Sequence, residues 1–130
     1  MEPVITSIAA AVALGAAAGL KDTASKAVTD AYAGLKKLIQ DRYNKDEDVT
    51  DAFDYLVKKP EAEGRQQELA KALQEVEADK EHELVHAAEA LLAEVEKQPG
   101  GEEAVNHIVN QLIIGDGNIV AGAGDVNIKL

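Results

Sequence analysis

Apolar residues recur every three or four positions along most of the chain, which is the spacing of helices with one buried face. The apolar stripes cover residues 24–39, 49–57, 62–76, 84–95 and, more weakly, 104–112. Polar or helix-breaking residues separate them at residues 44–48, at Pro60, at Ala78-Asp79 and at Pro99. This body shows no strand-like alternation. The pattern therefore predicts an all-α bundle of five to six helices, counting the N-terminal segment.

Side chains that cap helices suggest where two of these helices begin. Asp22 or Thr23 stands just before the stripe that starts at residue 24 and is expected to be its N-cap. The stripe of residues 62–76 changes phase before Leu84, so a tight turn is expected near Ala78-Asp79, with Asp79 as the next N-cap.

The N-terminal segment differs from the rest because residues 3–20 carry no charge. Glu2 precedes this run, whereas a secretory signal would place Lys or Arg there. Seven of residues 4–20 are alanine, so insertion into a bilayer is only marginally favoured. Small residues recur every fourth position, which permits close helix contact in lipid. Two alternatives remain, a buried core helix and a membrane-active helix formed by Glu2, Val4, Ile5, Ile8, Val12, Leu14, Gly15 and Gly19.

Charge and composition exclude several classes of function. The net charge of −11 opposes binding to nucleic acid, and only four aromatic residues are available to stack on bases. The chain has no cysteine, which excludes thiol chemistry and a disulfide framework. Residues 44–99 hold sixteen acidic and seven basic residues, whereas residues 1–43 are close to neutral.

One catalytic motif occurs in the acidic region. His82, Glu83 and His86 match the HExxH pattern, in which two histidines bind zinc and the glutamate acts as general base. Both histidines fall on the face opposite the apolar stripe of Leu84 and Leu91, where a solvated position is the expectation. No nucleophile elbow or phosphate loop occurs either. We therefore expect no metal, no cofactor and no enzymatic activity.

The C-terminal residues repeat a short unit. Gly-Asp-x-Asn-Ile occurs at residues 115–119 and again at residues 124–128. Short aliphatic segments between Gly and Asp suit small strands joined by tight arcs, and equivalent asparagines can form ladders between stacked chains. The unit therefore predicts a cross-β motif formed by Gly115, Asp116, Asn118, Ile119, Val120, Gly122, Gly124, Asp125, Val126, Asn127 and Ile128. A disordered tail, a hairpin folded on the bundle and a calcium-binding nonapeptide repeat are the alternatives.

The order of these parts resembles a known family. The Met-Glu-Pro-Val start, the uncharged helix, the acidic bundle and the short tail are similar to bacterial Bell-domain proteins. These are relatives of fungal HeLo-like domains and of the four-helix executioner domain of the necroptosis pseudokinase MLKL. Residues Lys58-Lys59-Pro60, Arg65-Gln66 and Leu91-Leu92 share in this likeness. The tail resembles bacterial amyloid signalling sequences, although it lacks the glutamine of the mammalian RHIM core.

The resemblance implies a cell-death effector that serves immunity. Its helical domain would occupy residues 1–99, a linker or short helix residues 100–110, and the amyloid signalling motif residues 111–130. A matching motif on an NLR-like receptor would template the tail, and the assembled chains would move from the cytoplasm to the cell membrane and permeabilise it. A non-toxic helical adaptor that oligomerises through the same tail is the alternative.

Overall fold

The computed structural model describes the backbone of residues 3–19 and 25–121 and the side chains of these residues as far as Ile113. All regular structure in this part of the chain is helical. The elements are α1 (Pro3–Ala18), α2 (Lys26–Arg42), α3 (Glu47–Lys58), α4 (Glu63–Glu75), the short 3-10 helix η1 (Ala78–Lys80), α5 (His82–Glu96) and α6 (Gly101–Ala121). The all-α prediction is therefore confirmed for the bundle.

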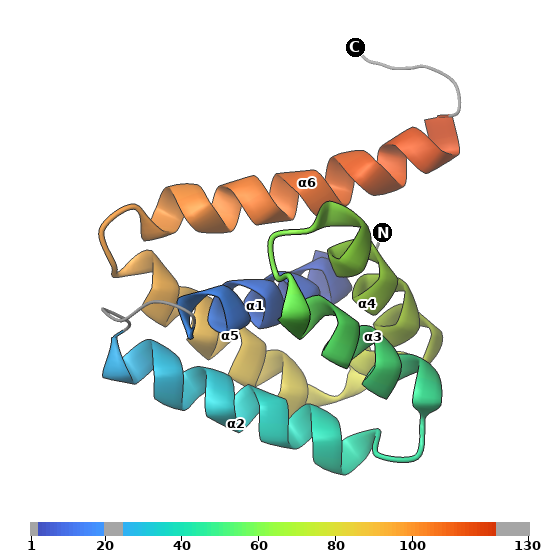
Figure 1. Cartoon of the computed structure of the whole chain (residues 1–130), viewed down its shortest axis with the longest axis horizontal. Helices are drawn as coiled ribbons and strands as arrows, with labels where there is room; N and C mark the ends of the chain where they lie inside the picture. Colours follow the sequence, from blue (N-terminus) through green and yellow to red (C-terminus); the bar gives the residue numbers. More distant parts are fainter. Residues whose placement is uncertain (1–2, 20–24, 122–130) are drawn as a thin grey trace.

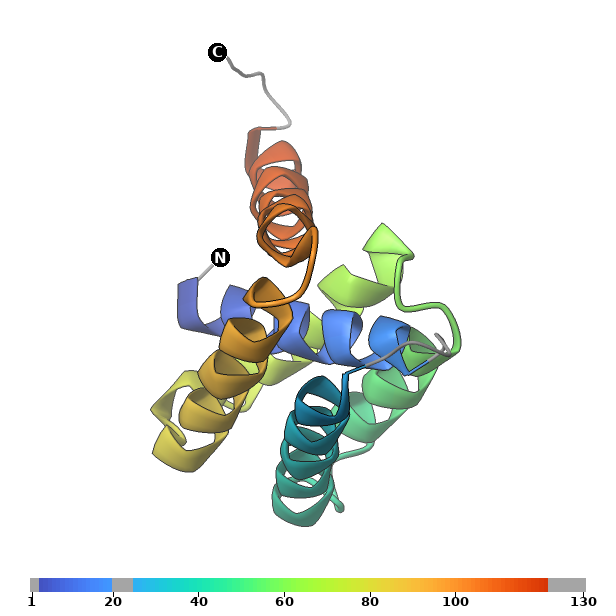
Figure 2. The ribbon, with the colours of Figure 1, turned by 90° about the vertical axis from the view of Figure 1, so that its left-hand side faces the viewer.

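Helix α1 lies at the centre of the bundle. Figures 1 and 2 show α2 and α6 on opposite sides of it, and α1 contacts all five of the other α-helices. Ten of its sixteen residues are buried, on every side of the helix. A helix that is apolar all round belongs in a core, because no face of it gains from contact with water. The expectation of a buried Ala-rich core helix is therefore met in this state of the protein.

The surrounding helices each bury one stripe against this centre. The predicted stripes supply the core residues Val28, Leu35 and Ile39 of α2, Val49, Phe53 and Leu56 of α3, Leu69 and Leu73 of α4, and Leu84, Leu91 and Val95 of α5. Arg65 adds a polar link between α3 and α4, since it donates to the Tyr55 carbonyl oxygen at 2.8 Å and stacks over the Tyr55 ring. The charged residues remain on the outer faces.

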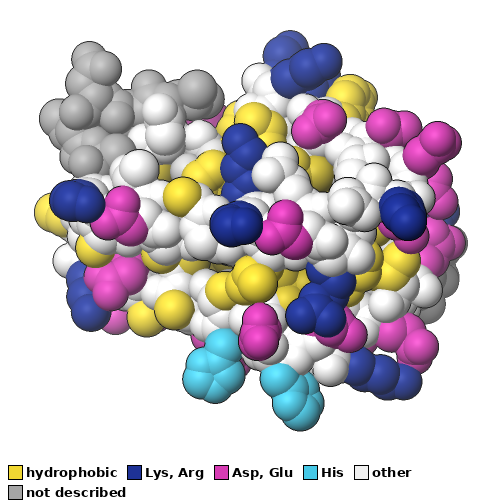
Figure 3. Space-filling model, turned by 90° about the horizontal axis from the view of Figure 1, so that it is seen from below, with side chains coloured by type: hydrophobic (Ala, Val, Ile, Leu, Met, Phe, Trp, Pro, Cys, Tyr) yellow, Lys and Arg dark blue, Asp and Glu magenta, His cyan; other side chains and the backbone are white. Residues whose placement is uncertain are grey.

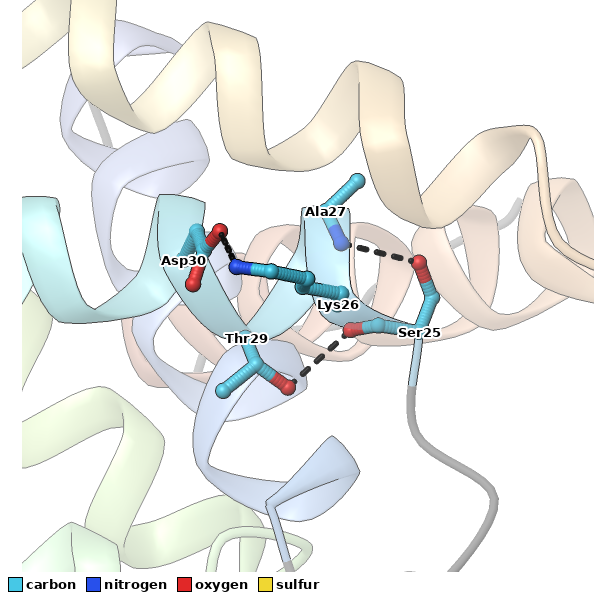
Figure 4. A network of polar contacts seen from close by, with 5 residues as sticks. All are labelled: Ser25, Lys26, Ala27, Thr29 and Asp30. Atoms are coloured by element: carbon cyan, nitrogen blue, oxygen red, sulfur yellow. Dashed lines mark hydrogen bonds and ion pairs between the residues drawn. The ribbon is translucent and has the colours of Figure 1, made fainter.

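Helix α2 starts later than its predicted caps. Its N-cap is Ser25, whose hydroxyl accepts the Ala27 N–H at 3.2 Å (Figure 4). The Ser25 carbonyl oxygen accepts the Thr29 hydroxyl at 3.0 Å, and Lys26 pairs with Asp30 at 2.8 Å, which raises the pKa of Lys26. The expectation that residue 22 or 23 caps this helix was wrong, because a serine closer to the stripe serves as well.

The tight turn between α4 and α5 lies near Ala78, as the change of phase between the two apolar stripes predicted. The 3-10 helix there buries Ala78 completely, and Glu77 precedes it in the left-handed conformation with φ 54°. The expected cap was wrong, however. Asp79 lies inside the 3-10 helix, and the N-cap of α5 is Glu81, which forms an ion pair with Arg42 instead of a side-chain capping bond.

Helix α6 extends the bundle beyond residue 99. It begins at Gly101, where a Cβ atom would overlap the Val95 carbonyl group, so this tight approach to the end of α5 requires glycine. Val105, Ile108 and Leu112 are buried, and the helix contacts α1, α4 and α5. Residues 100–110, which were expected to be a linker or short helix, are therefore part of the packed bundle.

Candidate functional site: the first helix and the C-terminal segment

The predicted membrane-active side chains lie inside the protein. Ile5, Ile8 and Val12 are completely buried, and Val4 and Leu14 are half-buried against the same core. All five of the other α-helices contact α1. These residues can reach a membrane only if α1 leaves its position at the centre.

The length of α1 limits what it could do in a bilayer. Sixteen residues at about 1.5 Å each give a helix of about 24 Å, shorter than the hydrocarbon core of about 30 Å. Within the residues that the structure describes, no helix has both the length and the apolar character needed to cross a membrane.

The small-residue stripe of α1 has a packing role in this state. Ala11 and Gly15 are buried, whereas Gly19 is exposed just beyond the helix. Gly15 faces Tyr32 of α2 so closely that a Cβ atom there would lie 3.0 Å from the Tyr32 Cβ and nearer still to the ring. The Tyr32 hydroxyl is buried without a hydrogen-bond partner, and burial raises the pKa of Tyr32. Gly15 therefore permits the contact between α1 and α2.

A cleft of about 840 Å³ adjoins the C-terminal end of α1. Leu14, Ala17 and Ala18 line it from α1, and its other walls are the start of α2, the α3–α4 loop, the end of α5 with the loop that follows it, and α6. Its polar side chains include His107 and Gln111, which form a hydrogen bond with each other at 3.0 Å. Sequence reasoning missed both the Tyr32 contact and this cleft, because neither produces a local pattern.

The HExxH residues lie on the outside of α5. His82, Glu83 and His86 are all exposed. In the described ranges no group of three or more His, Cys, Asp or Glu side chains is arranged to hold a metal ion. The face on which they lie is the solvated one, as their helical spacing indicated.

The repeated C-terminal unit falls largely beyond the described side chains. The backbone of Gly115, Asp116, Asn118, Ile119 and Val120 continues α6 as a helix. The remaining motif residues lie outside the described residues, as does Glu2; they are Gly122, Gly124, Asp125, Val126, Asn127 and Ile128. Cross-β assembly of this segment stays a prediction. In the structure, the first copy of the repeated unit continues without a break from a helix that packs on α1.

Comparison with known proteins gave one family. The model of the Het-E N-terminal domain matches residues 1–128, almost the whole chain. This family is related to HeLo and cell-death effector domains. Comparisons with curated proteins and with solved structures gave no match.

Proposed function

Because the chain belongs to the Het-E N-terminal domain family, we propose that it is a cell-death effector that permeabilises membranes through α1 after its C-terminal motif assembles. It acts by assembly rather than by catalysis. A matching motif on an NLR-like receptor supplies the template. The protein waits in the cytoplasm and reaches the cell membrane when activated. In a bacterium this would serve immunity.

The continuity of α6 is the observation that carries this proposal. The first half of α6 buries Val105, Ile108 and Leu112 in the core, the helix contacts α1, and its second half contains the first copy of the repeated unit. Glycine, aspartate and asparagine within residues 115–118 are weak helix formers, so this end of α6 resists unwinding poorly. A strand cannot form here unless the helix unwinds toward Leu112. Assembly of the tail would thus loosen the packing of α6 against α1.

The hydrocarbon of a bilayer can then replace the protein core as the apolar surroundings of α1. The helix carries no charged side chain, so moving it into lipid leaves no ion to desolvate. One copy is short and only marginally apolar, but stacked tails bring many copies together and raise their effective concentration. Small residues every fourth position favour contact between such helices in lipid.

An engineered disulfide between α1 and α2 tests this release directly. The natural chain has no cysteine, so Gly15→Cys with Tyr32→Cys introduces the sole pair. The two Cβ positions are 3.0 Å apart, slightly closer than the usual 3.5–4.5 Å, and removal of the Tyr32 ring leaves room for a small adjustment. The oxidised protein should form fibrils through its tail yet leave liposomes intact. Reduction of the same sample should restore leakage.

The two arms of this experiment separate the possible failures. Fibrils with leakage in the oxidised form would show that α1 need not leave the core, and the release mechanism would be wrong. Fibrils without leakage in either redox form, and in the parent protein, would favour a helical adaptor that recruits another protein. The central position of α1, with ten of its sixteen residues buried, is the observation that makes this second candidate worth testing.

A further inference from the structure

Helix α1 lies between two pairs of helices. Helices α2 and α5 pack on each other and on α1, while α3 and α4 form a hairpin that also packs on α1 (Figure 1). In the described part of the chain, the two pairs are joined chiefly through α1, α6 and the 3-10 helix η1. The outer helices therefore form two units, and α1 is the main element between them.

The α3–α4 hairpin, residues 47–75, is held together by two side chains of α4. Arg65 donates to the Tyr55 carbonyl oxygen at 2.8 Å and stacks over the Tyr55 ring. Gln66 is completely buried, and its Nε2 donates to the Pro60 carbonyl oxygen in the loop at 2.8 Å. Both contacts lie inside the hairpin. The hairpin can therefore move as one unit without breaking either of them.

Both ends of this hairpin join the rest of the chain at one place. Arg42 at the end of α2 forms an ion pair with Glu81 just after η1, so the two connecting segments lie side by side. Glu77, between α4 and η1, has φ 54° and is the one residue other than glycine with positive φ among the described residues. Such strained conformations are rare and occur at switch regions. The two segments therefore have the geometry of a hinge.

The tip of the hairpin, at the end far from the hinge, borders open space. Pro60 and Glu61 line the cleft of about 840 Å³ together with Ala18 of α1 and Ala104 of α6. Residues that border open space lose packing contacts on that side. The tip is therefore the part of the hairpin that can lift most easily from the bundle.

We propose that the α3–α4 hairpin is a lid on α1, which swings about this hinge and uncovers α1 while α2 and α5 stay in place. This inference rests on the function proposed above and deepens it, because it assigns the side on which α1 becomes exposed. Apart from the hinge, the lid packs on α1 and α6. Helix α6 is the one that the assembling tail would loosen. Tail assembly therefore removes the lid's support on α6.

An open lid presents an apolar surface to a membrane. Helix α1 buries residues on every side, so the side that had faced α4 is apolar. The side of the molecule on which α2 lies is different, because charged side chains of both signs are spread over it (Figure 3). A bilayer would therefore meet α1 on the lid side, while the α2–α5 pair stays in water.

Native-state hydrogen exchange of the full chain tests the lid in solution, after fibrils have been pelleted. The amide groups of α3 and α4 should exchange as one unit, at least about tenfold faster than those of α2 and α5. Leu69→Ala on α4 should speed exchange in both hairpin helices by about tenfold or more. Leu91→Ala is the matched control, because Leu91 is also completely buried but lies on α5, and exchange in the hairpin should stay unchanged.

Pairs of spin labels measure the same movement on membranes. The natural chain has no cysteine, so Glu61→Cys with Glu96→Cys labels the tip of the lid and the end of α5. Gln40→Cys with Glu83→Cys labels α2 and α5 as the control pair, and all four positions are exposed. Helix α4 is about 20 Å long, so a rotation of about 30° moves the tip by about 10 Å. On liposomes with assembled tails, the first distance should lengthen by about this amount and the second should not change.

Three results would overturn the lid. The first is equal protection from exchange in the two pairs of helices. The second is leakage of liposomes while the distance across the lid stays the same. The third is an equal lengthening of both distances, which would mean that the whole bundle opens. Tail assembly without leakage would instead count against the proposed function, because the exchange experiment in solution still decides whether the hairpin is a lid.

Discussion

Substitution of Gly15 by alanine should destabilise the protein although alanine is the better helix former. The new Cβ atom would lie 3.0 Å from the Tyr32 Cβ and closer to its ring, so the tyrosine must move out of its position between α1 and α2. Overpacking of this kind costs about 1–3 kcal/mol, and the gain in helix propensity returns about 1 kcal/mol. Because the tyrosine ring carbons would lie closer than 3.0 Å, the upper part of this range, about 2–3 kcal/mol, applies. The net loss is then about 1–2 kcal/mol, or about 4–8 °C in Tm for a chain of this size.

The same substitution at Gly34 is the matched control for this prediction. No atom lies within 4 Å of a Cβ placed at Gly34, and this glycine is inside α2. Gly34→Ala should therefore stabilise the protein by about 0.5–1 kcal/mol. Both variants are measured by chemical denaturation followed by circular dichroism, at low concentration so that association does not contribute.

A double-mutant cycle shows whether Tyr32 is the cause. With Tyr32→Ala the ring is absent, and Gly15→Ala should then be neutral or stabilising, which gives a coupling of about 1 kcal/mol or more between the two positions. Because the clash loosens α1 from α2, Gly15→Ala should also cause leakage at a lower protein concentration. If Gly15→Ala stabilised the protein as much as Gly34→Ala, the assigned role of Gly15 would be refuted.

Three further outcomes are expected. A peptide of residues 111–130 should form fibrils with cross-β spacings of about 4.7 and 10 Å. The double variant Ile119→Lys with Ile128→Lys should not form fibrils, because it repeats a charge in every layer. If the variant peptide assembled as fast as the parent peptide, the stacked-repeat model would be contradicted. Leu14→Lys can reach water through the neighbouring cleft, so the bundle should still fold by circular dichroism. A charge inside a membrane-embedded helix costs up to about 3 kcal/mol in lipid, so this variant should abolish leakage. Burial raises the pKa of Tyr32 above its value in the unfolded chain, so the free energy of unfolding should be unaffected below about pH 10 and fall as the pH rises further. Tyr32→Phe should make this fall shallower, and an unchanged slope in alkaline denaturation would argue against a buried Tyr32 hydroxyl.

The sequence by itself determined the helices around the centre. The stripes of α2, α3, α4 and α5 were read correctly because each depends on residues three or four positions apart, and burial of one face follows from local geometry. Helix ends were read less well. Ser25 caps α2 in place of its predicted neighbours, because several nearby polar side chains could satisfy the same backbone groups. Asp79 lies inside the 3-10 helix, and no side chain caps α5.

Only the tertiary structure decided where the uncharged first helix lies. A helix without charge is acceptable both in lipid and in a protein core, so its own residues leave the two environments open. The choice depends on helices far along the chain, including α6, which contacts α1 and buries Val105, Ile108 and Leu112 in the same core. The contact of Gly15 with Tyr32 and the cleft at the C-terminal end of α1 are of the same kind. They join residues that are distant in sequence, and no periodic pattern along the chain records which of them meet.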